Sequence, residues 1–224
     1  MYDTYQPPTR FSVFPPIIKN LLILNGLFFM AGLVPTTQDL LLRWLALWPL
    51  GTPDVVRTSL GLEVVPGFWP WQLVTYSFLH GGFGHLFFNM FALWMFGVQI
   101  ENTWGSRRFA IFYFVCVIGA ALCQLVVSWG DPVPIVGASG GVFGILLAFG
   151  MMFPNQPIYL YFLFPIKAKW FVIGYGLIEL WAGIAGTQTG VAHFAHLGGM
   201  LFGFVLIQYW RGKLPVRPAR RMYW

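Results

Sequence analysis

The chain has 224 residues, of which 58% are hydrophobic and only 9% carry a charge. Soluble domains carry about 25% charged residues, so this composition excludes a soluble globular protein. An aromatic content of 19% also excludes a disordered chain.

Six apolar segments are separated by polar connections, and we expect each to cross a membrane as a helix. They are Ile17 to Val34, Gly84 to Ile100, Phe109 to Trp129, Gly140 to Phe153, Trp170 to Ala185 and Val191 to Trp210. The expected fold class is an all-α polytopic membrane protein with six transmembrane helices and a long first external loop. Residues 1–16 would form a cytoplasmic N-terminal segment, residues 17–210 the membrane domain and residues 211–224 a basic cytoplasmic tail.

The basic residues predict the orientation, because cytoplasmic connections are enriched in Lys and Arg. With a cytoplasmic N-terminus, eleven of the thirteen lie on the cytoplasmic side, and only Arg43 and Arg57 lie outside. The eleven are Arg10, Lys19, Arg107, Arg108, Lys167, Lys169, Arg211, Lys213, Arg217, Arg220 and Arg221. We therefore expect both termini in the cytoplasm. The net charge of +6 then reflects contact with the lipid bilayer, and no nucleic-acid partner is expected.

The first external connection, about residues 35–71, is rich in tryptophan. Apolar residues recur in it at helical spacing, which is typical of a helix lying in the membrane interface. These residues are Leu40, Leu41, Trp44, Leu45 and Trp48. Of the two interpretations we favour an aromatic belt that anchors the loop.

Polar side chains inside a membrane are costly and are therefore functional candidates. All four histidines lie at the outer ends of predicted helices, and Asn89 follows one of them by a helical turn. The histidines are His80, His85, His193 and His196. Their common depth indicates one site near the outer surface.

Ser139 begins the fourth predicted helix, within the sequence Gly137-Ala138-Ser139-Gly140. A serine at this place is commonly an N-cap. However, a helix of about fourteen residues spans only about 21 Å, less than the ~30 Å hydrocarbon core. Ser139 is thus expected below the outer surface, where a cap alone has no need to be, and it is a candidate nucleophile.

Pairs of glycines four residues apart predict close packing of the fourth helix against the sixth. The pairs are Gly140 with Gly144 and Gly199 with Gly203. His196 lies three residues before Gly199 and shares its face, so we expect it opposite Ser139. A serine beside a general base is the arrangement of nucleophilic catalysis, and His85 and Asn89 offer donors to a developing oxyanion.

These motifs resemble those of the rhomboid family of intramembrane serine proteases. Three sequences carry the resemblance: His80-x4-His85-x3-Asn89, Gly137-Ala138-Ser139-Gly140 and Ala195-His196-x2-Gly199-x3-Gly203. Gly97-x3-Glu101, Gly105 and the Arg107-Arg108 pair support them. The match follows the family's order from about Asn20 to Gln208.

The resemblance implies a rhomboid-like core in a bacterial cytoplasmic membrane that cleaves transmembrane segments of membrane-protein substrates near their outer end. It implies a Ser–His dyad without a third acid, with Ser139 as nucleophile and His196 as general base. His85 and Asn89 would stabilise the oxyanion, and Glu101 would be a structural hydrogen-bonding residue. The supporting positions are His80, Gly137, Gly140, Phe143, Gly199 and Gly203. Neither a cofactor nor a metal ion is implied.

Two positions depart from the family's pattern. Gln72 follows Trp71 where members often carry an arginine, so a contact made by that arginine is in question. Phe143 stands where a tyrosine is frequent; stacking on His196 could persist without the hydroxyl. Neither change affects the dyad.

Two other functions remain open. A non-catalytic rhomboid-like membrane-protein binding or quality-control factor would use the same fold, although it would typically lack the serine or the histidine. His80, His85 and His193 could instead bind haem or a transition metal, but no His-Glu-x-x-His sequence or metal-binding cysteine pair supports this.

The remaining polar residues are assigned to structure. Glu179, counted from the inner end of its helix, lies about 15 Å deep and out of reach of His196. We expect it to make a structural hydrogen bond as a neutral acid, since burial disfavours charge. His193 is expected to be structural and Gln124 to join helices. Cys116 and Cys123 are expected to be packing residues.

Overall fold

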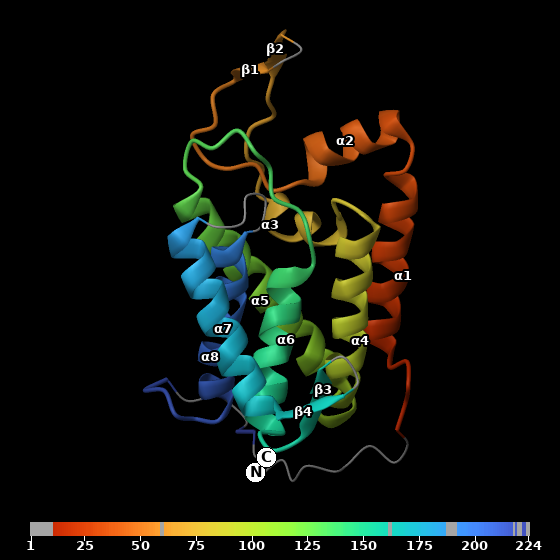
Figure 1. Ribbon diagram of the computed structural model, residues 1–224, viewed down its shortest axis with the longest axis vertical. Coiled ribbons are helices and arrows are strands. Elements are labelled where there is room, and N and C mark those ends of the chain that lie inside the picture. Colours follow the sequence, from red (N-terminus) through yellow and green to blue (C-terminus); the bar gives the residue numbers. More distant parts are fainter. Residues whose placement is uncertain are drawn as a thin grey trace.

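The computed structural model describes residues 11–58, 61–160, 163–186, 192–216, 218 and 221–222. Residues 1–10, with Arg10, and the predicted positions of Val191, Arg217 and Arg220 lie outside these ranges. Each predicted membrane segment coincides with a helix, and the six helices lie side by side (Figure 1). They are α1 (Pro16–Ala31), α4 (Phe83–Trp104), α5 (Ser106–Val127), α6 (Ser139–Met152), α7 (Ala168–Ala185) and α8 (His193–Trp210).

Three helices of the described part, α4, α5 and α7, are long and apolar enough to cross a membrane. α1 and α6 are apolar but shorter, and α8 has 18 residues that include two histidines. Several helices expose large apolar side chains, among them those of Leu27, Phe88 and Leu177. The fold is that of a mostly helical polytopic membrane protein. That all six helices cross the membrane remains a prediction.

The start of α1 is attached to the end of α4 by a buried carboxylate. Glu101 accepts hydrogen bonds from the backbone N–H groups of Ile17 and Ile18 at 3.0 Å and from the Ser106 hydroxyl at 2.7 Å. The first N–H groups of a helix have no partner within the helix, and their partial positive charge favours such an acceptor. Glu101 thus makes the structural contacts expected of it.

The first loop forms a small cap at one end of the bundle. It contains α2 (Pro35–Leu45), an antiparallel hairpin of β1 (Val55–Thr58) and β2 (Gly61–Val64), α3 (Gln72–Thr75) and a 3₁₀ turn at Tyr76–Phe78. The helical spacing in this loop corresponds to α2, which lies across the bundle end (Figure 1). It stops at Leu45, however, and Trp48 lies beyond it and is buried.

Gln72, at the position of the family's arginine, is fully buried under this cap. Its side-chain oxygen accepts hydrogen bonds from the backbone N–H groups of Trp48 and Trp69, both at 3.2 Å. The amide therefore joins two parts of the loop.

The opposite end of the bundle carries a second hairpin, which is not among the predicted elements. Strand β3 (Pro157–Leu160) pairs antiparallel with β4 (Phe164–Lys167), and Pro157 lies opposite Lys167. The hairpin leads from α6 into α7, and the first turn of α1 and the last turn of α8 lie at this same end (Figure 1).

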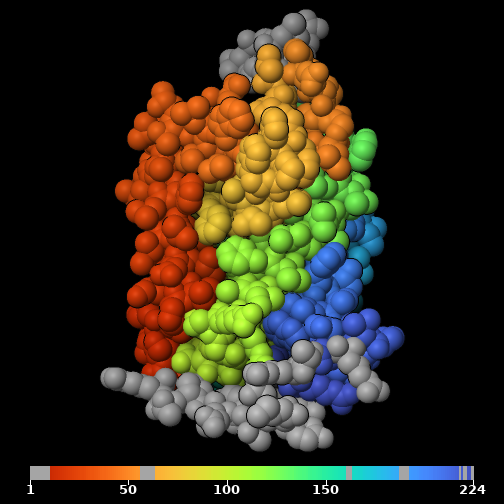
Figure 2. Space-filling view, turned by 180° about the vertical axis from the view of Figure 1, so that it is seen from behind, coloured from red at the N-terminus to blue at the C-terminus, as the bar shows by residue number. Residues whose placement is uncertain are grey.

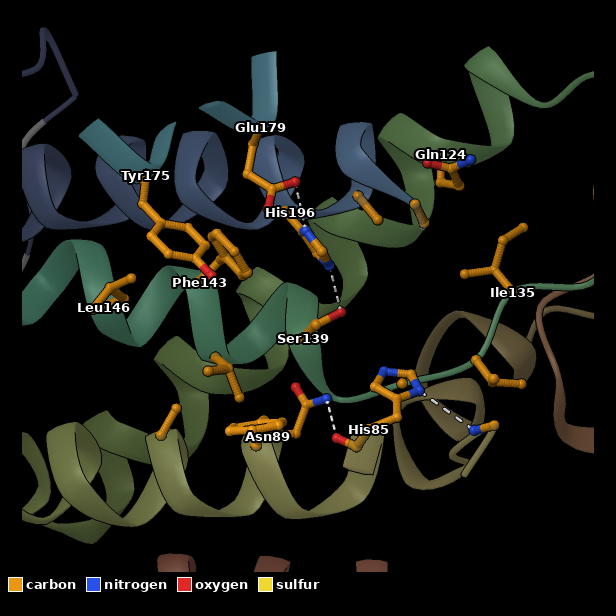
Figure 3. A pocket seen from close by; sticks show the side chains of 18 of the residues that line it. His85, Asn89, Gln124, Ile135, Ser139, Phe143, Leu146, Tyr175, Glu179 and His196 are labelled. Carbon is orange, nitrogen blue, oxygen red and sulfur yellow. Dashed lines mark hydrogen bonds and ion pairs between the residues drawn. The ribbon is translucent and has the colours of Figure 1, made fainter. Parts of the chain in front are cut away.

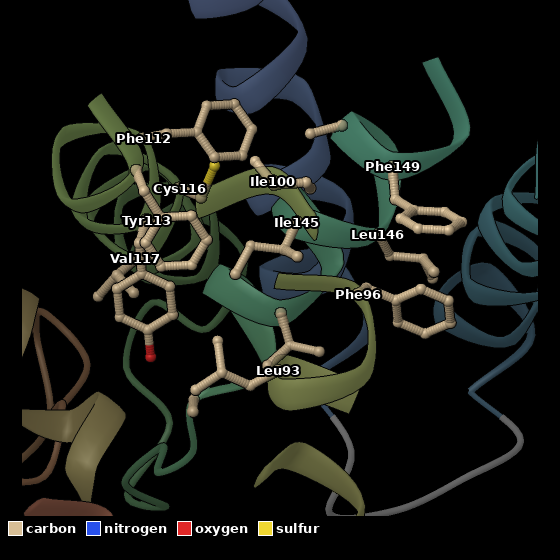
Figure 4. Close-up of a cluster of buried hydrophobic side chains, with 14 of the residues drawn as sticks. Leu93, Phe96, Ile100, Phe112, Tyr113, Cys116, Val117, Ile145, Leu146 and Phe149 are labelled. Atoms are coloured by element: carbon tan, nitrogen blue, oxygen red, sulfur yellow. The ribbon is translucent and has the colours of Figure 1, made fainter. Parts of the chain in front are cut away.

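The hydrophobic core lies where α4, α5 and α6 meet (Figure 4). α4 contributes Leu93, Phe96 and Ile100; α5 contributes Phe112, Tyr113, Cys116 and Val117; and α6 contributes Ile145, Leu146 and Phe149. Cys116 is a free, buried thiol, as its expected packing role requires. Seen from behind, α1, α5 and the lower part of α8 form much of the visible surface (Figure 2).

Candidate active site

Ser139 is carried into the bundle by the loop that precedes α6. The backbone of Ile135 pairs in both directions with Leu47, at 2.9 and 3.0 Å, and the Gly137 N–H donates to the Tyr76 carbonyl. Gly137 then adopts φ +129°, a conformation that other residues rarely reach. As a result α6 begins lower in the bundle than α4 (Figure 1), which agrees with the expected depth of Ser139.

The hydroxyl of Ser139 points to His196 rather than to the backbone of its own helix (Figure 3). Ser139 Oγ lies 2.8 Å from His196 Nε2. The N-cap position of α6 belongs to Ala138, and no side chain caps the helix. The structure therefore does not support the capping interpretation, and it brings together the predicted nucleophile and base.

The pair is brought together by direct backbone contact between α6 and α8. A methyl group placed on Gly199 would overlap the carbonyl oxygen of Gly140. Gly144 packs on Cys116 of α5 and also approaches the Gly199 carbonyl of α8, whereas Gly203 packs on Phe112 and Cys116 of α5. Three of the four predicted glycines thus lie at the expected interface, and the fourth faces α5.

The ring of Phe143 lies flat on His196, as the sequence predicts. The ring centroids are 4.2 Å apart and the planes differ by 5°. This contact fills one face of the imidazole and restricts its rotation.

His85 and Asn89 approach Ser139 from α4 (Figure 3). The Gly81 N–H donates to His85 Nδ1 at 3.4 Å, which leaves the hydrogen of a neutral ring on Nε2. That nitrogen lies beside Gly137, where an added Cβ would stand 2.8 Å from it. Asn89 donates one amide hydrogen to the His85 carbonyl, and its second hydrogen remains for the site.

His80 lies behind His85, with the two rings edge to face and their centroids 4.9 Å apart. Neither ring nitrogen of His80 has a hydrogen-bond partner within the described ranges. Burial, and next the neighbouring His85, lower the pKa of His80 to about 4, so its ring is neutral at ordinary pH.

Glu179 is the residue whose position was predicted wrongly. Its Oε2 lies 2.9 Å from His196 Nδ1 and 2.7 Å from His193 Nδ1, so it does reach the base. Counting from the inner end of α7 was misleading. Counted from the outer end, Ala185, Glu179 lies about 9 Å deep, within a side chain's length of His196, about 5 Å into α8. That count would have revealed the contact.

A cavity of about 1110 Å³ opens in front of these groups. Ser139, His196, His85 and Asn89 all line it. One wall is apolar and is formed by α4 and α7, and further polar residues, Gln124, Ser128 and Asp131, line the part near the α5–α6 loop. Gln124 therefore faces the cavity, and the interhelical bond expected of it does not appear among the described hydrogen bonds.

The side chains that come closest to forming a metal site are not the three histidines considered from the sequence. Glu179, His193 and His196 place one donor atom each within 4.8 Å of one another, whereas His80 and His85 form a separate pair. Hydrogen bonds that Glu179 Oε2 accepts from the two imidazoles account for this cluster without an ion.

Fold and site together define a polytopic membrane protein with a hydrogen-bonded serine and histidine in a cavity between its helices. Residues 68–212 match the Rhomboid domain. The chain belongs to the rhomboid family.

Several relatives are similar to this chain. "Rhomboid protease GluP" of Bacillus subtilis (strain 168) is 35% identical over 142 residues, which are 63% of this chain and 26% of that protein. "RHOMBOID-like protein 6, mitochondrial" of Arabidopsis thaliana is 32% identical over 150 residues, 64% of this chain and 45% of its own length. "Putative rhomboid protease YdcA" of Bacillus subtilis (strain 168) is 29% identical over 196 residues, 86% and 89% of the two chains. The chain thus spans less than half of the first two relatives and most of the third.

Proposed function

We propose that this protein is an intramembrane serine endopeptidase that cleaves transmembrane segments of membrane proteins near their outer end. The observation that carries the proposal is the 2.8 Å contact between Ser139 Oγ and His196 Nε2 inside the cavity. Membership of the rhomboid family and the similarity to "Rhomboid protease GluP" support it.

In the proposed reaction, Ser139 Oγ attacks the scissile carbonyl carbon while its proton moves to His196 Nε2. The carbonyl oxygen becomes an oxyanion, for which Nε2–H of His85, the amide of Asn89 and the first N–H groups of α6 are the available donors. The C–N bond then breaks and His196 returns the proton to the leaving nitrogen. Water hydrolyses the resulting ester by the same steps.

The lining of the cavity supports a membrane-embedded substrate. Phe88, Phe91 and Tyr175 line it from α4 and α7, and their rings are at least partly exposed. An apolar segment lying there would exchange contact with lipid for contact with these rings. Ser128 and Asp131 form a polar path by which water could reach the ester.

The proposed location is a bacterial cytoplasmic membrane, with both termini in the cytoplasm. The positive-inside distribution supports this orientation. The start of α1 and the end of α8 also lie at the same end of the bundle: Trp104, close to the α1 attachment at Glu101, packs against Trp210 at 5.7 Å.

The test is cleavage of a single-pass substrate by purified wild-type protein and by the Ser139→Ala and His196→Ala variants in detergent or liposomes. Both variants should lose activity by several orders of magnitude, because nucleophile and base act as one unit. Ser77→Ala is the matched control: it removes another buried hydroxyl, one that donates to the Val74 carbonyl at 2.7 Å and lies outside the residues that line the cavity. Cleavage by Ser139→Ala would refute the proposal.

Labelling by a serine-directed phosphonate separates this function from its alternative. The protease should be labelled at Ser139, and the label should be absent from Ser139→Ala. A wild-type protein that binds membrane proteins but is neither labelled nor active would instead be a binding or quality-control factor.

A further inference from the structure

Glu179 is the one carboxylate of the described part that contacts the proposed base. Its side chain projects from α7 toward α8. Figure 3 shows the side chains of Glu179, His196 and Ser139 arranged one after another in a row. Its side chain is 9% exposed, and those of His193 and His196 are 7% and 11% exposed. A carboxylate in such surroundings is costly unless donors satisfy it. Here a single oxygen, Oε2, lies within hydrogen-bond distance of two imidazole nitrogens.

The contacts of His196 decide which ring nitrogen can act as base. A neutral imidazole carries one N–H and one lone pair. With Glu179 Oε2 at 2.9 Å from Nδ1, the hydrogen lies on Nδ1, and the lone pair of Nε2 faces the Ser139 hydroxyl. The other tautomer would direct an N–H at Ser139 and could not take its proton.

His193 helps to fix the carboxylate oxygen of Glu179 in place. It lies one turn before His196 on the same face of α8, and its Nδ1 is 2.7 Å from the same oxygen. An oxygen that accepts from both rings is held in one place relative to α8. Two N–H donors on one oxygen favour the ionised carboxylate over the neutral acid expected from the sequence.

We propose that Glu179 is a positioning residue for His196: its ionised carboxylate selects the Nδ1–H tautomer and stabilises the imidazolium formed when Ser139 loses its proton. The inference rests on the proposed function. It extends the expected dyad to a hydrogen-bonded chain of three residues. In this chain Glu179 remains ionised and takes no proton. It also gives α7 a role in aligning the base.

The tautomer can be measured without any substrate. The chain has four histidines, so ¹⁵N-histidine labelling gives a sparse NMR spectrum of ring nitrogens. The signals lost in His196→Ala identify that ring. We expect His196 in wild-type protein to carry its hydrogen on Nδ1, and Glu179→Gln to yield a mixture of tautomers. A wild-type His196 protonated on Nε2 would overturn the inference, even if no Glu179 variant folds.

Kinetics test the same inference. Glu179→Gln keeps the size of the side chain and removes its charge. We expect kcat and the rate of phosphonate labelling to fall by about 10²- to 10⁴-fold, with KM changed by less than about threefold. Glu179→Asp keeps the charge on a shorter side chain and should recover part of the loss. An unchanged labelling rate in Glu179→Gln would overturn the inference.

Glu101→Gln is the matched control, because it makes the same chemical change at a second buried carboxylate, whose described hydrogen bonds are to α1 and α5. It should lower the thermal midpoint and the folded fraction but leave kcat per labelled site unchanged. If Glu179→Gln behaves in the same way, its role is structural and the inference fails. A wild-type protein with the Nδ1–H tautomer that cleaves nothing would support the hydrogen bond to Glu179 and contradict the proposed function.

Discussion

Gly199 of α8 lies against the backbone carbonyl of Gly140 in α6, so close that no side chain fits between them. This contact sets the separation of the two helices that carry His196 and Ser139. In membranes, where lipid is as apolar as the helix surface, such close packing supplies much of the attraction between helices.

Gly199→Ala should therefore separate α6 from α8, lower the thermal midpoint in detergent and reduce cleavage. Overpacking of this kind costs about 1–3 kcal/mol. Gly174→Ala is the control, because no heavy atom lies within 4 Å of its added Cβ and alanine favours a helix. Equal thermal midpoints for the two variants would contradict this account of the interface.

Removal of the ring at position 143 should impair the base without unfolding the protein. Phe143 stacks on His196 at 4.2 Å, and aromatic pairs contribute about 0.5–1.5 kcal/mol beyond their burial. Phe143→Leu should lower kcat about 3- to 10-fold, whereas Phe143→Tyr, which retains the ring, should stay close to wild type. Full activity of Phe143→Leu, measured on the same substrate, would argue against a role for stacking.

The amide of Asn89 should matter for kcat more than for stability. Loss of one oxyanion donor typically costs about 10²- to 10³-fold in kcat, and we expect this of Asn89→Leu. Asn25→Leu is a close control: Asn25 is buried in α1 and donates to the Leu21 carbonyl at 2.8 Å, as Asn89 does to His85. If both variants lower kcat equally, Asn89 has no special part in the reaction.

His80 should make the fold sensitive to acid. Its pKa is lowered from 6.5 to about 4 by burial, so the unfolded chain binds a proton at pH values where the folded protein does not. Stability from this group is therefore present above about pH 6.5 and is lost as pH falls toward 4. His80→Phe should show a smaller drop in thermal midpoint between pH 7 and pH 4 than wild type. An identical drop would contradict the assignment.

Single cysteines can test the proposed orientation. In a variant with Cys123 replaced by alanine, Asp54→Cys and Lys213→Cys place thiols at two exposed positions on opposite ends of the bundle. An impermeant maleimide should label position 54 from outside intact cells and position 213 only after lysis. The reverse pattern would invert the topology.

The positions of the helices could be predicted from the sequence, because a hydrocarbon surrounding requires long apolar runs in which the backbone satisfies its own hydrogen bonds. The structure places a helix on every predicted segment, within about four residues at each end. The same constraint made the few polar residues conspicuous. The meeting of His196 with Ser139 followed from the glycine spacing, since helical periodicity places His196 and Gly199 on one face.

Other features depended on contacts between segments far apart in the chain. The buried side chain of Gln72 accepts a hydrogen bond from the Trp48 N–H, and the loop that lowers Ser139 is held by the Leu47–Ile135 backbone pair; no local pattern encodes either contact. The contact between Glu179 and His196 joins two helices whose relative depth the sequence leaves free.

The sequence by itself thus determined the membrane class, the helices and the choice of candidate site residues, because burial in lipid and helical periodicity act locally along the chain. Only the tertiary structure decided which nitrogen of His196 faces Ser139 and that Glu179 holds the other. A hydrogen bond forms only when its two heavy atoms come within about 3.2 Å, and these distances are set by how α6, α7 and α8 pack together.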